Sequence, residues 1–453
     1  MNEPAFSEKQ SVAVRRIMWG ELFPWLVLVR VFRCAIAPGP LLLATAAVAL
    51  TSLGWWVTGY VLLSEEQFQR QRGSVLLAGP VAAPGHHMLD QPNALESYLP
   101  ANYGVTQPFK RLAAPAMRLF SSDTTLVHVV YYLIGFLISI AVWAFAGGVI
   151  SRQALVQIGT DQAYDWLDAA RFVAPRYLQY FLAPLAPLLA VVAMGLLVVP
   201  LGWLMRLDFG LLVAGLLWIF VIGLGLIAAW LIIGLFFGWP LMFGVIGSKR
   251  DGDSLQAFSD SFSYVYGKPL HYLWYAFVAL AIGGLALFVI HLFALAATEF
   301  GWWAASWGAG LERTTQIRRE VDIVKQGGDL AAPAMHEGGV ELIALVLNLV
   351  EVIELAAAYS YFFVAAAVIF LLLRLAVDEK EMDEVHLEED EEQLETARRG
   401  MLSDEAAAPP PATPTPAPPS PEATVTFDTV SPEPPPPAVN DTEITTPEPK
   451  PPE

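Results

Sequence analysis

Residues 209–246, which make up nearly all of the longest uncharged stretch of the chain, read FGLLVAGLLWIFVIGLGLIAAWLIIGLFFGWPLMFGVI. A helix of about 20 apolar residues crosses a hydrocarbon core of about 30 Å, so this stretch can span a membrane and extend beyond it. Gly223, Gly225 and Pro240 offer kink points within one long span. The same length also suits a tight hairpin of two shorter spans, and the sequence leaves this alternative open.

Five further apolar stretches indicate that the chain crosses a membrane several times. Of its 453 residues, 55% are hydrophobic and only 15% are charged, which excludes an ordinary soluble protein. We predict an all-α polytopic membrane helical bundle of about six transmembrane helices, in which Gly234 and Gly238 form a small-residue face that another helix approaches closely. The predicted spans, which make up a transmembrane domain over residues 40–377, are 40–63, 126–150, 180–205, 209–246, 272–298 and 342–377.

Basic side chains near the span ends predict the orientation. They are frequent before the first span and after the second and fourth spans, and the positive-inside rule places these segments in the cytoplasm. We therefore expect an inner-membrane protein with both termini in the cytoplasm, although the outer loops also contain basic residues that argue the other way. In this topology the segment 1–39, with its amphipathic helix, and the elbows 151–179 and 247–271 are cytoplasmic, and the loops 64–125 and 299–341 are outside.

An internal repeat relates the two elbows. Residues 148–150 and 244–246 both read GVI, and the segment from Asp161 aligns without gaps to the segment from Asp253. Two copies of one unit most simply lie on the same side of the membrane. Residues 36–41 resemble the corresponding part of both copies, so the chain reads as three units, each an elbow helix followed by a helical hairpin. The identical pairs are Asp161/Asp253, Asp168/Asp260, Val173/Val265, Leu178/Leu270 and Tyr180/Tyr272.

Each elbow predicts a short amphipathic helix. Apolar residues recur at helical spacing around Trp166 in the first copy and Phe258 in the second, and Asp161 and Asp253 are placed to cap the two helices. One interpretation is an elbow that only orients the next span, and the other is a docking surface for a cytoplasmic protein. The predicted interface contacts are Asp161, Trp166, Asp168, Asp253, Phe258 and Asp260.

A few ionisable residues lie inside the predicted spans. His291 lies in the fifth span and Glu351 and Glu354 lie near the start of the sixth; because these spans are antiparallel, His291 and Glu354 can share a depth in the outer leaflet. His128, at the outer start of the second span, fits the same layer. Buried ionisable groups are costly and often functional, so these four residues form a predicted ion or proton site. The alternative is that the sixth helix projects beyond the bilayer and its glutamates are in water.

The tail, residues 378–453, contains 20 acidic and four basic side chains and accounts for all but two charges of the net −18. Residues 378–395 predict an acidic helical continuation of the last span, and the proline-rich part from Ala406 predicts disorder. The tail is either a solubilising appendage or a tether for a cytoplasmic protein.

The rest of the sequence contains no signature of an enzyme. The single cysteine, Cys34, cannot form an intramolecular disulfide, and the pair His86 and His87 lacks further ligands at metal-site spacing. A basic amphipathic segment around Lys110, Arg111 and Arg118 predicts a helix that lies on the membrane surface. We expect no cofactor, no metal ion and no nucleic-acid partner.

The second elbow, residues 253–270, reads DSLQAFSDSFSYVYGKPL and resembles the segment before a span in several six-helix bacterial membrane-protein families. These include the membrane domain found beside some glycerophosphodiester phosphodiesterases. The resemblance covers residues 140–298 and implies a fold without a reaction, because the hydrolytic domain of those enzymes, with its metal-binding carboxylates, is missing from this chain.

Three functional hypotheses follow. The first is a non-catalytic membrane scaffold or assembly protein that recruits a partner, the second is a transporter or channel subunit that uses the His/carboxylate cluster, and the third is a membrane enzyme. A water-filled cavity lined by His291 and Glu354 favours transport, whereas a solid helix core favours the scaffold.

Overall fold

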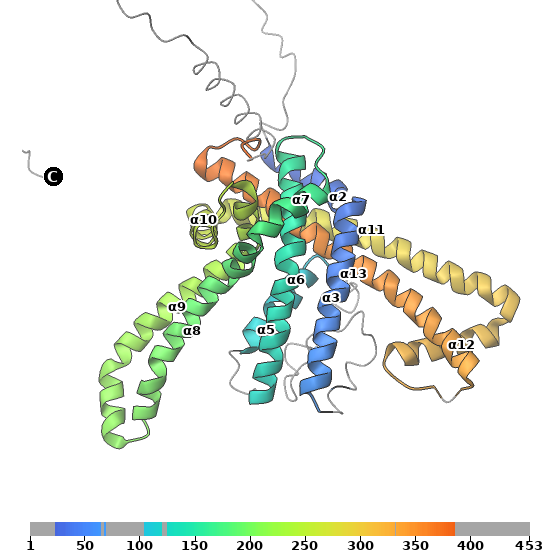
Figure 1. The fold of residues 1–453 in the computed structure, drawn as a ribbon, viewed down its shortest axis with the longest axis horizontal. Helices are drawn as coiled ribbons and strands as arrows, with labels where there is room; N and C mark the ends of the chain where they lie inside the picture. Colours follow the sequence, from blue (N-terminus) through green and yellow to red (C-terminus); the bar gives the residue numbers. More distant parts are fainter. Residues whose placement is uncertain (1–22, 65–67, 69–103, 120–124, 331, 386–453) are drawn as a thin grey trace, which may run out of the picture. The chain divides into compact units, whose positions relative to one another are not determined.

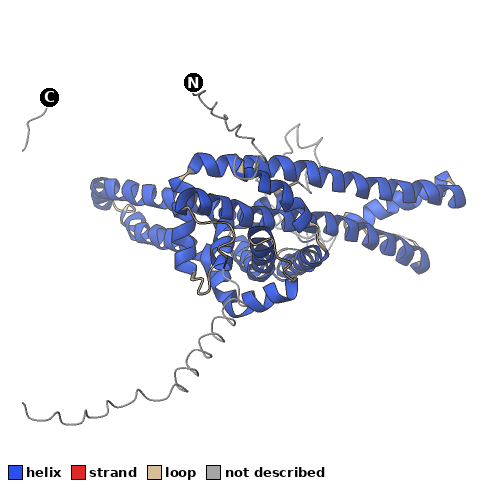
Figure 2. Cartoon of the chain, turned by 90° about the horizontal axis from the view of Figure 1, so that it is seen from above, coloured by secondary structure: helices blue, strands red, loops and turns tan. Residues whose placement is uncertain are grey.

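The computed structural model describes residues 23–64, 68, 104–119, 125–330 and 332–385. In these residues it contains helices and loops and no strand (Figure 2). The predicted disorder of the tail from Ala406 and the pair His86 and His87 lie outside the described residues.

Six long apolar helices confirm the predicted spans. Each is long and apolar enough to cross a membrane, and the chain is an integral membrane protein with an all-α fold. Each observed span includes nearly all of the predicted one, and several extend well beyond it. The long helices are α3 (Pro38–Leu62), α6 (Leu126–Gly159), α8 (Tyr177–Leu204), α9 (Asp208–Ser248), α11 (Pro269–Ala309) and α13 (Ala334–Asp378).

Three of the short helices, α2, α7 and α10, are the elbow helices. Each begins a unit that continues with two spans. The units are α2 with α3 and α6, α7 with α8 and α9, and α10 with α11 and α13. Figure 1 shows α2, α7 and α10 near the same end of the long helices. The short helices are η1 (Pro24–Val27), α2 (Leu28–Ala35), α5 (Gln107–Leu119), α7 (Trp166–Val173), η3 (Ala174–Arg176), α10 (Ser254–Gly267) and α12 (Leu311–Lys325).

The uncharged stretch 209–246 forms one helix, α9, and not a hairpin. Its small-residue face does meet another helix, which is the elbow helix α10 and not a span. A Cβ atom on Gly234 would come within 2.2 Å of Phe262 Cε1, and one on Gly238 would lie 3.6 Å from Ser261 Cβ. The glycines therefore set the distance at which α10 packs against α9.

Helix α13 is the centre of the fold. In its most apolar stretch 78% of the residues are buried, whereas the corresponding value for α9 is 6%. Large side chains of α13 fit against glycines of three other spans. Cβ atoms on these glycines would come within 3.0 Å of the facing ring, and the pairs are Phe363 with Gly147 of α6, Phe370 with Gly244 of α9 and Tyr361 with Gly283 of α11. The far parts of the α8–α9 hairpin diverge from this centre (Figure 1).

Helix α5 corrects one prediction. The basic segment does not lie on the surface but packs between spans, with Leu112 buried. The ring of Phe109 lies 4.7 Å from that of Phe236 and 5.9 Å from that of Trp239, measured between centroids. The sequence pattern was amphipathic, but the apolar face packs against aromatic side chains of α9 instead of lipid.

The predicted helical continuation of the last span is wrong for the described residues that follow it. Helix α13 ends at Asp378, and Glu379 adopts a left-handed conformation with φ of 56°. The chain then turns back, and Val385 is buried in the main core. A Cβ atom on Gly159 would lie 2.6 Å from the carbonyl oxygen of Met382, so this turn packs closely against the end of α6.

Candidate functional site

The structure brings His291 and Glu354 together. His291 of α11 and Glu354 of α13 lie on antiparallel helices, and Nδ1 of the imidazole is 2.8 Å from Oε2 of the carboxylate. The Glu354 side chain is 8% exposed and that of His291 is 26% exposed. A hydrogen bond between an imidazole and a carboxylate at this distance satisfies both groups and can share a proton between them.

Glu351, one turn before Glu354, has a different partner. Lys325, the last residue of α12, contacts the Glu351 carboxylate through its ammonium group. Both side chains are about a quarter exposed, so this ion pair lies at the edge of the protein. The predicted cluster therefore consists of two separate pairs along α13, each with its own partner helix.

A second group of polar contacts joins α12 to the start of α13. Nε2 of His336 is 2.6 Å from Oε2 of Glu320, and Arg313 donates to Nδ1 of His336 at 3.0 Å. Arginine only donates, so Nδ1 accepts and the proton of the ring lies on Nε2. Hydrogen bonds from Gln316 and then from His336 lower the pKa of Glu320. Sequence reasoning missed these contacts, since α12 fell inside a predicted loop.

His128 is not part of this cluster. It lies near the start of α6, where its Nδ1 is 2.6 Å from Oγ1 of Thr125. Helix α6 packs mainly against α3, α5, α7, α8, α9 and α13, whereas the pairs above lie between α11, α12 and α13. The sequence predicted the same membrane depth for His128 and for His291 and Glu354. Equal depth does not make residues neighbours, because their helices lie in different parts of the bundle.

The first elbow differs in detail from its prediction. Asp161 does not cap α7; it adopts a left-handed conformation with φ of 56° and pairs with Arg30 of α2. The cap is Asp165, whose side chain accepts from the backbone N–H of Trp166 at 2.7 Å. Asp168 pairs with Arg171 at 2.9 Å on the exposed face of α7. The helix begins later than the repeat suggested because the chain first turns at Asp161.

The buried face of α7 is not centred on Trp166. Trp166 is 39% exposed and lies against Gly39 at the start of α3, whereas Phe172 is fully buried. The ring of Phe172 lies between two guanidinium groups, 4.0 Å from Arg152 and 3.9 Å from Arg176. The predicted stripe is therefore displaced toward Phe172, because the helix is short and packs against Arg152.

The second elbow is closer to its prediction. Phe258 is partly buried, and its ring lies 4.4 Å from that of Phe262, which contacts Gly234. Asp260 forms an ion pair with Lys249 at 2.6 Å. Asp253 occupies the N-cap position of α10 but makes no side-chain bond to the free N–H groups of the helix.

Arg152 is a central residue that sequence reasoning assigned to a cytoplasmic loop. Helix α6 continues past it to Gly159, and Arg152 is fully buried. Its Nη1 donates to the carbonyl oxygen of Gly247 at 2.7 Å, which ties the end of α6 to the end of α9. The repeat offered a signal, because residues 148–152 and 244–248 occupy equivalent positions at the two helix ends.

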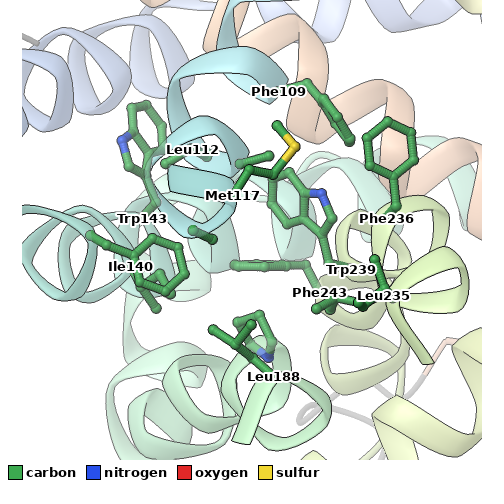
Figure 3. Close-up of a pocket in the computed structure, with 15 residues that line it drawn as sticks. Phe109, Leu112, Met117, Ile140, Trp143, Leu188, Leu235, Phe236, Trp239 and Phe243 are labelled. Carbon is green, nitrogen blue, oxygen red and sulfur yellow. The ribbon is translucent and has the colours of Figure 1, made fainter. Parts of the chain in front are cut away.

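Cavities lie between the helices in the part of the chain that the structure describes, and two of them bear on function. The larger of the two, of about 160 Å³, is a partly open cavity between α5, α6, α8 and α9 and is lined by apolar side chains such as Phe109, Trp239 and Leu188 (Figure 3). Its apolar lining suits an apolar group such as a side chain or an acyl chain. The smaller cavity is lined by both polar and apolar side chains and lies between α3, α5, α6 and α13. Neither cavity is lined by His291, Glu351 or Glu354.

Comparisons with family models, with curated proteins and with solved structures found no match to this chain. The resemblance of residues 140–298 to six-helix membrane families stays a prediction.

Proposed function

We propose that the protein is a non-catalytic membrane scaffold that holds a cytoplasmic partner protein at an inner membrane. One observation carries the proposal: His291, Glu351 and Glu354, the residues of the predicted ion or proton site near α13, are each paired with another side chain and line neither of the cavities described above. His291 is bonded to Glu354, and Lys325 is bonded to Glu351. Groups paired in this way serve to hold α11, α12 and α13 together.

The solid inner core supports the same proposal. The second half of α6, the last nine residues of α9 (240–248) and most of the second half of α13 are buried, and the elbows pack around them. Arg152 fixes α6 to α9, and Tyr264 of α10 donates to Asp378 at the end of α13 at 2.6 Å. A rigid end of this kind suits a platform, whereas transport by alternating access requires helices that move against each other.

The elbows supply the proposed docking surface. Leu167 of α7 and Leu255 of α10 are exposed, although other apolar residues of the same helices, such as Phe172 and Phe262, are buried. Exposed apolar side chains surrounded by polar ones are typical of interaction surfaces. The acidic tail, residues 388–453, is the second proposed contact with the partner.

We place this end of the molecule in the cytoplasm. The elbows and the end of α13 lie together, as the contacts of Arg30 with Asp161 and of Tyr264 with Asp378 require. The basic residues Arg171, Lys249 and Lys268 belong to the same end, which favours the cytoplasm by the positive-inside rule.

Labelling of a cysteine that replaces Ser263, on a Cys34→Ala background, tests this orientation. Modification by a membrane-impermeant reagent in intact cells contradicts it.

Capture of cross-linked partners tests the scaffold function. The full chain is compared with a chain that ends at residue 387 and with a Leu167→Ser/Leu255→Ser variant, after cross-linking in cells and purification in mild detergent. The cut follows residue 387 because Val385 belongs to the core. We expect at least one protein to be recovered from the full chain and lost from one of the two variants. Gln256→Ala, an exposed polar change beside Leu255, is the matched control.

The scaffold function fails if all four chains yield the same proteins as an unrelated membrane protein of similar size. Such a result leaves neither the elbows nor the tail with a partner.

A proton-coupled transporter is the second candidate function, and the 2.8 Å contact of His291 with Glu354 favours it. Liposomes that contain the full-length protein and an enclosed pH-sensitive dye test it. A pH gradient is imposed across the liposome membrane. Transport is supported if protons enter liposomes with the natural chain and do not enter liposomes with Glu354→Gln. Equal rates for the two proteins and for empty liposomes exclude a proton path through this pair.

A further inference from the structure

A small chamber with several polar side chains in its lining lies inside the bundle where α3, α5, α6 and α13 meet. Thr51, Arg111, Trp143 and Tyr359 line it, one from each of these helices. Its volume is about 10 Å³, which accommodates about one sphere of the size of a water molecule. Thr51 and Tyr359 lie near the middle of their helices, so the chamber is deep in the membrane-spanning region.

Several polar groups around the chamber have no protein partner. The indole Nε1 of Trp143 and Oγ1 of Thr51 are buried without a hydrogen bond, and Trp143 as a whole is only 2% exposed. The half-buried Arg111 has no hydrogen bond or ion pair within the part of the chain that the structure describes. By contrast, the neighbouring indole of Trp55 donates to Oγ of Ser139 at 3.0 Å.

The unsatisfied groups have the chemistry of an anion site. Indole and guanidinium groups can only donate hydrogen bonds, and a hydroxyl donates as well as accepts. Arg111 is positively charged, and none of the described residues that line the chamber is acidic. A charge away from water is costly unless an opposite charge or several hydrogen bonds compensate it. The lining of the chamber thus contains a positive charge and several hydrogen-bond donors, and no acidic side chain among its described residues.

We propose that this chamber binds one small monovalent anion of halide size, held by the guanidinium of Arg111, the indole N–H of Trp143 and the hydroxyl of Thr51. A single water molecule fits the volume but leaves the charge of Arg111 uncompensated. Phosphate and sulfate are larger than the chamber. The proposal is independent of the scaffold function, because it concerns the interior of the bundle and not its cytoplasmic end.

Thermal unfolding of the full-length protein in detergent tests the proposal. The protein is titrated with sodium chloride or sodium bromide against sodium gluconate at constant ionic strength. We expect Tm to rise and level off with chloride and bromide, as for any ligand that binds only the native state, and to stay constant with gluconate, whose anion exceeds the chamber. Arg111→Gln and Trp143→Phe should raise the apparent Kd for bromide by at least about tenfold, since each removes a hydrogen bond to a charged group.

Two variants are matched controls. Lys110→Gln removes the same charge from the adjacent, exposed position of α5, and Trp56→Phe removes another unpartnered indole N–H from α3, outside the chamber. Both should keep the natural response to bromide. If Arg111→Gln does not fold, Trp143→Phe and the isosteric Thr51→Val carry the comparison.

Crystals grown with bromide give the direct result, which is an anomalous peak within hydrogen-bond reach of Arg111 and Trp143. Equal Tm values in chloride and gluconate overturn the proposal. So does an unchanged response in both Arg111→Gln and Trp143→Phe, or a chamber that contains only water in the presence of bromide.

Discussion

Phe262 of the elbow helix α10 lies directly against Gly234 of the span α9, so closely that a Cβ atom on Gly234 would be 2.2 Å from the ring. We therefore expect Gly234→Ala to push α10 away from α9 and to lower the free energy of unfolding by about 1–3 kcal/mol, as overpacking does in well-packed cores. The measurement is thermal unfolding in detergent. Phe262→Leu in addition should restore part of the loss, because it shortens the side chain that clashes.

Gly225 provides the control for this substitution. It lies on the same helix, and nothing is within 4 Å of a Cβ atom built on it. Gly225→Ala should leave the stability unchanged or raise it slightly, since alanine favours helices. Equal losses from the two glycine substitutions contradict a specific contact between α9 and α10.

The pair of His291 and Glu354 predicts a graded response to substitution. Glu354→Ala leaves the imidazole without its acceptor in a mostly buried place, and we expect a loss of about 1–3 kcal/mol in the free energy of unfolding. Glu354→Gln keeps an oxygen that accepts from Nδ1 and should cost less. Thermal unfolding of both variants is compared with Glu341→Ala, which changes an exposed glutamate of the same helix. A similar Tm for all three shows that the pair does not stabilise the bundle.

The features that the sequence predicted correctly can all be derived from the order and spacing of residues along the chain. The six spans, the close approach at Gly234 and the pairing of His291 with Glu354 all follow from apolar length, small residues or the antiparallel order of neighbouring spans. These features depend on periodicity and order along the chain, so they can be derived without knowing how the helices pack.

The features that sequence reasoning missed depend on which helices meet. Arg152 looked like a loop residue because arginine normally ends a span. In the structure it contacts the ring of Phe172 and the carbonyl oxygen of Gly247, which come from later segments of the chain. Arg111 looked like a surface residue because its helix is basic, and only the packing of α5 reveals the chamber. The partner of Glu351 came from α12, whose residues the hydropathy assigned to a loop.

Cys34 predicts a characteristic pH dependence of labelling. Burial raises the pKa of its thiol to about 11, an effect that the nearby Arg30 only partly opposes. The thiolate is the reactive form, and its fraction rises about tenfold per pH unit below the pKa. The labelling rate with maleimide should therefore keep rising steeply through pH 9 and 10. A cysteine at the exposed Ser263, on a Cys34→Ala background, should level off near the ordinary thiol pKa of about 8.5. A plateau for Cys34 near that pH contradicts the buried environment.

The two aromatic residues of α7 should separate stability from partner binding. Phe172 is fully buried between Arg152 and Arg176, so Phe172→Ala removes a core side chain together with two cation–π contacts. A loss of about 3–5 kcal/mol is typical of such a truncation. Trp166 is 39% exposed, and Trp166→Ala should change Tm little.

If the elbows bind a partner, Trp166→Ala should affect partner capture more than it affects stability. Trp166→Ala should reduce the recovery of the cross-linked partner at unchanged stability, because an exposed tryptophan is the type of residue that anchors protein interfaces. Trp166→Phe, which keeps an aromatic ring at the same position, should retain most of the recovery. Full recovery from Trp166→Ala together with a stable fold shows that α7 only orients the span that follows it, and leaves α10 and the tail as the contacts to be tested.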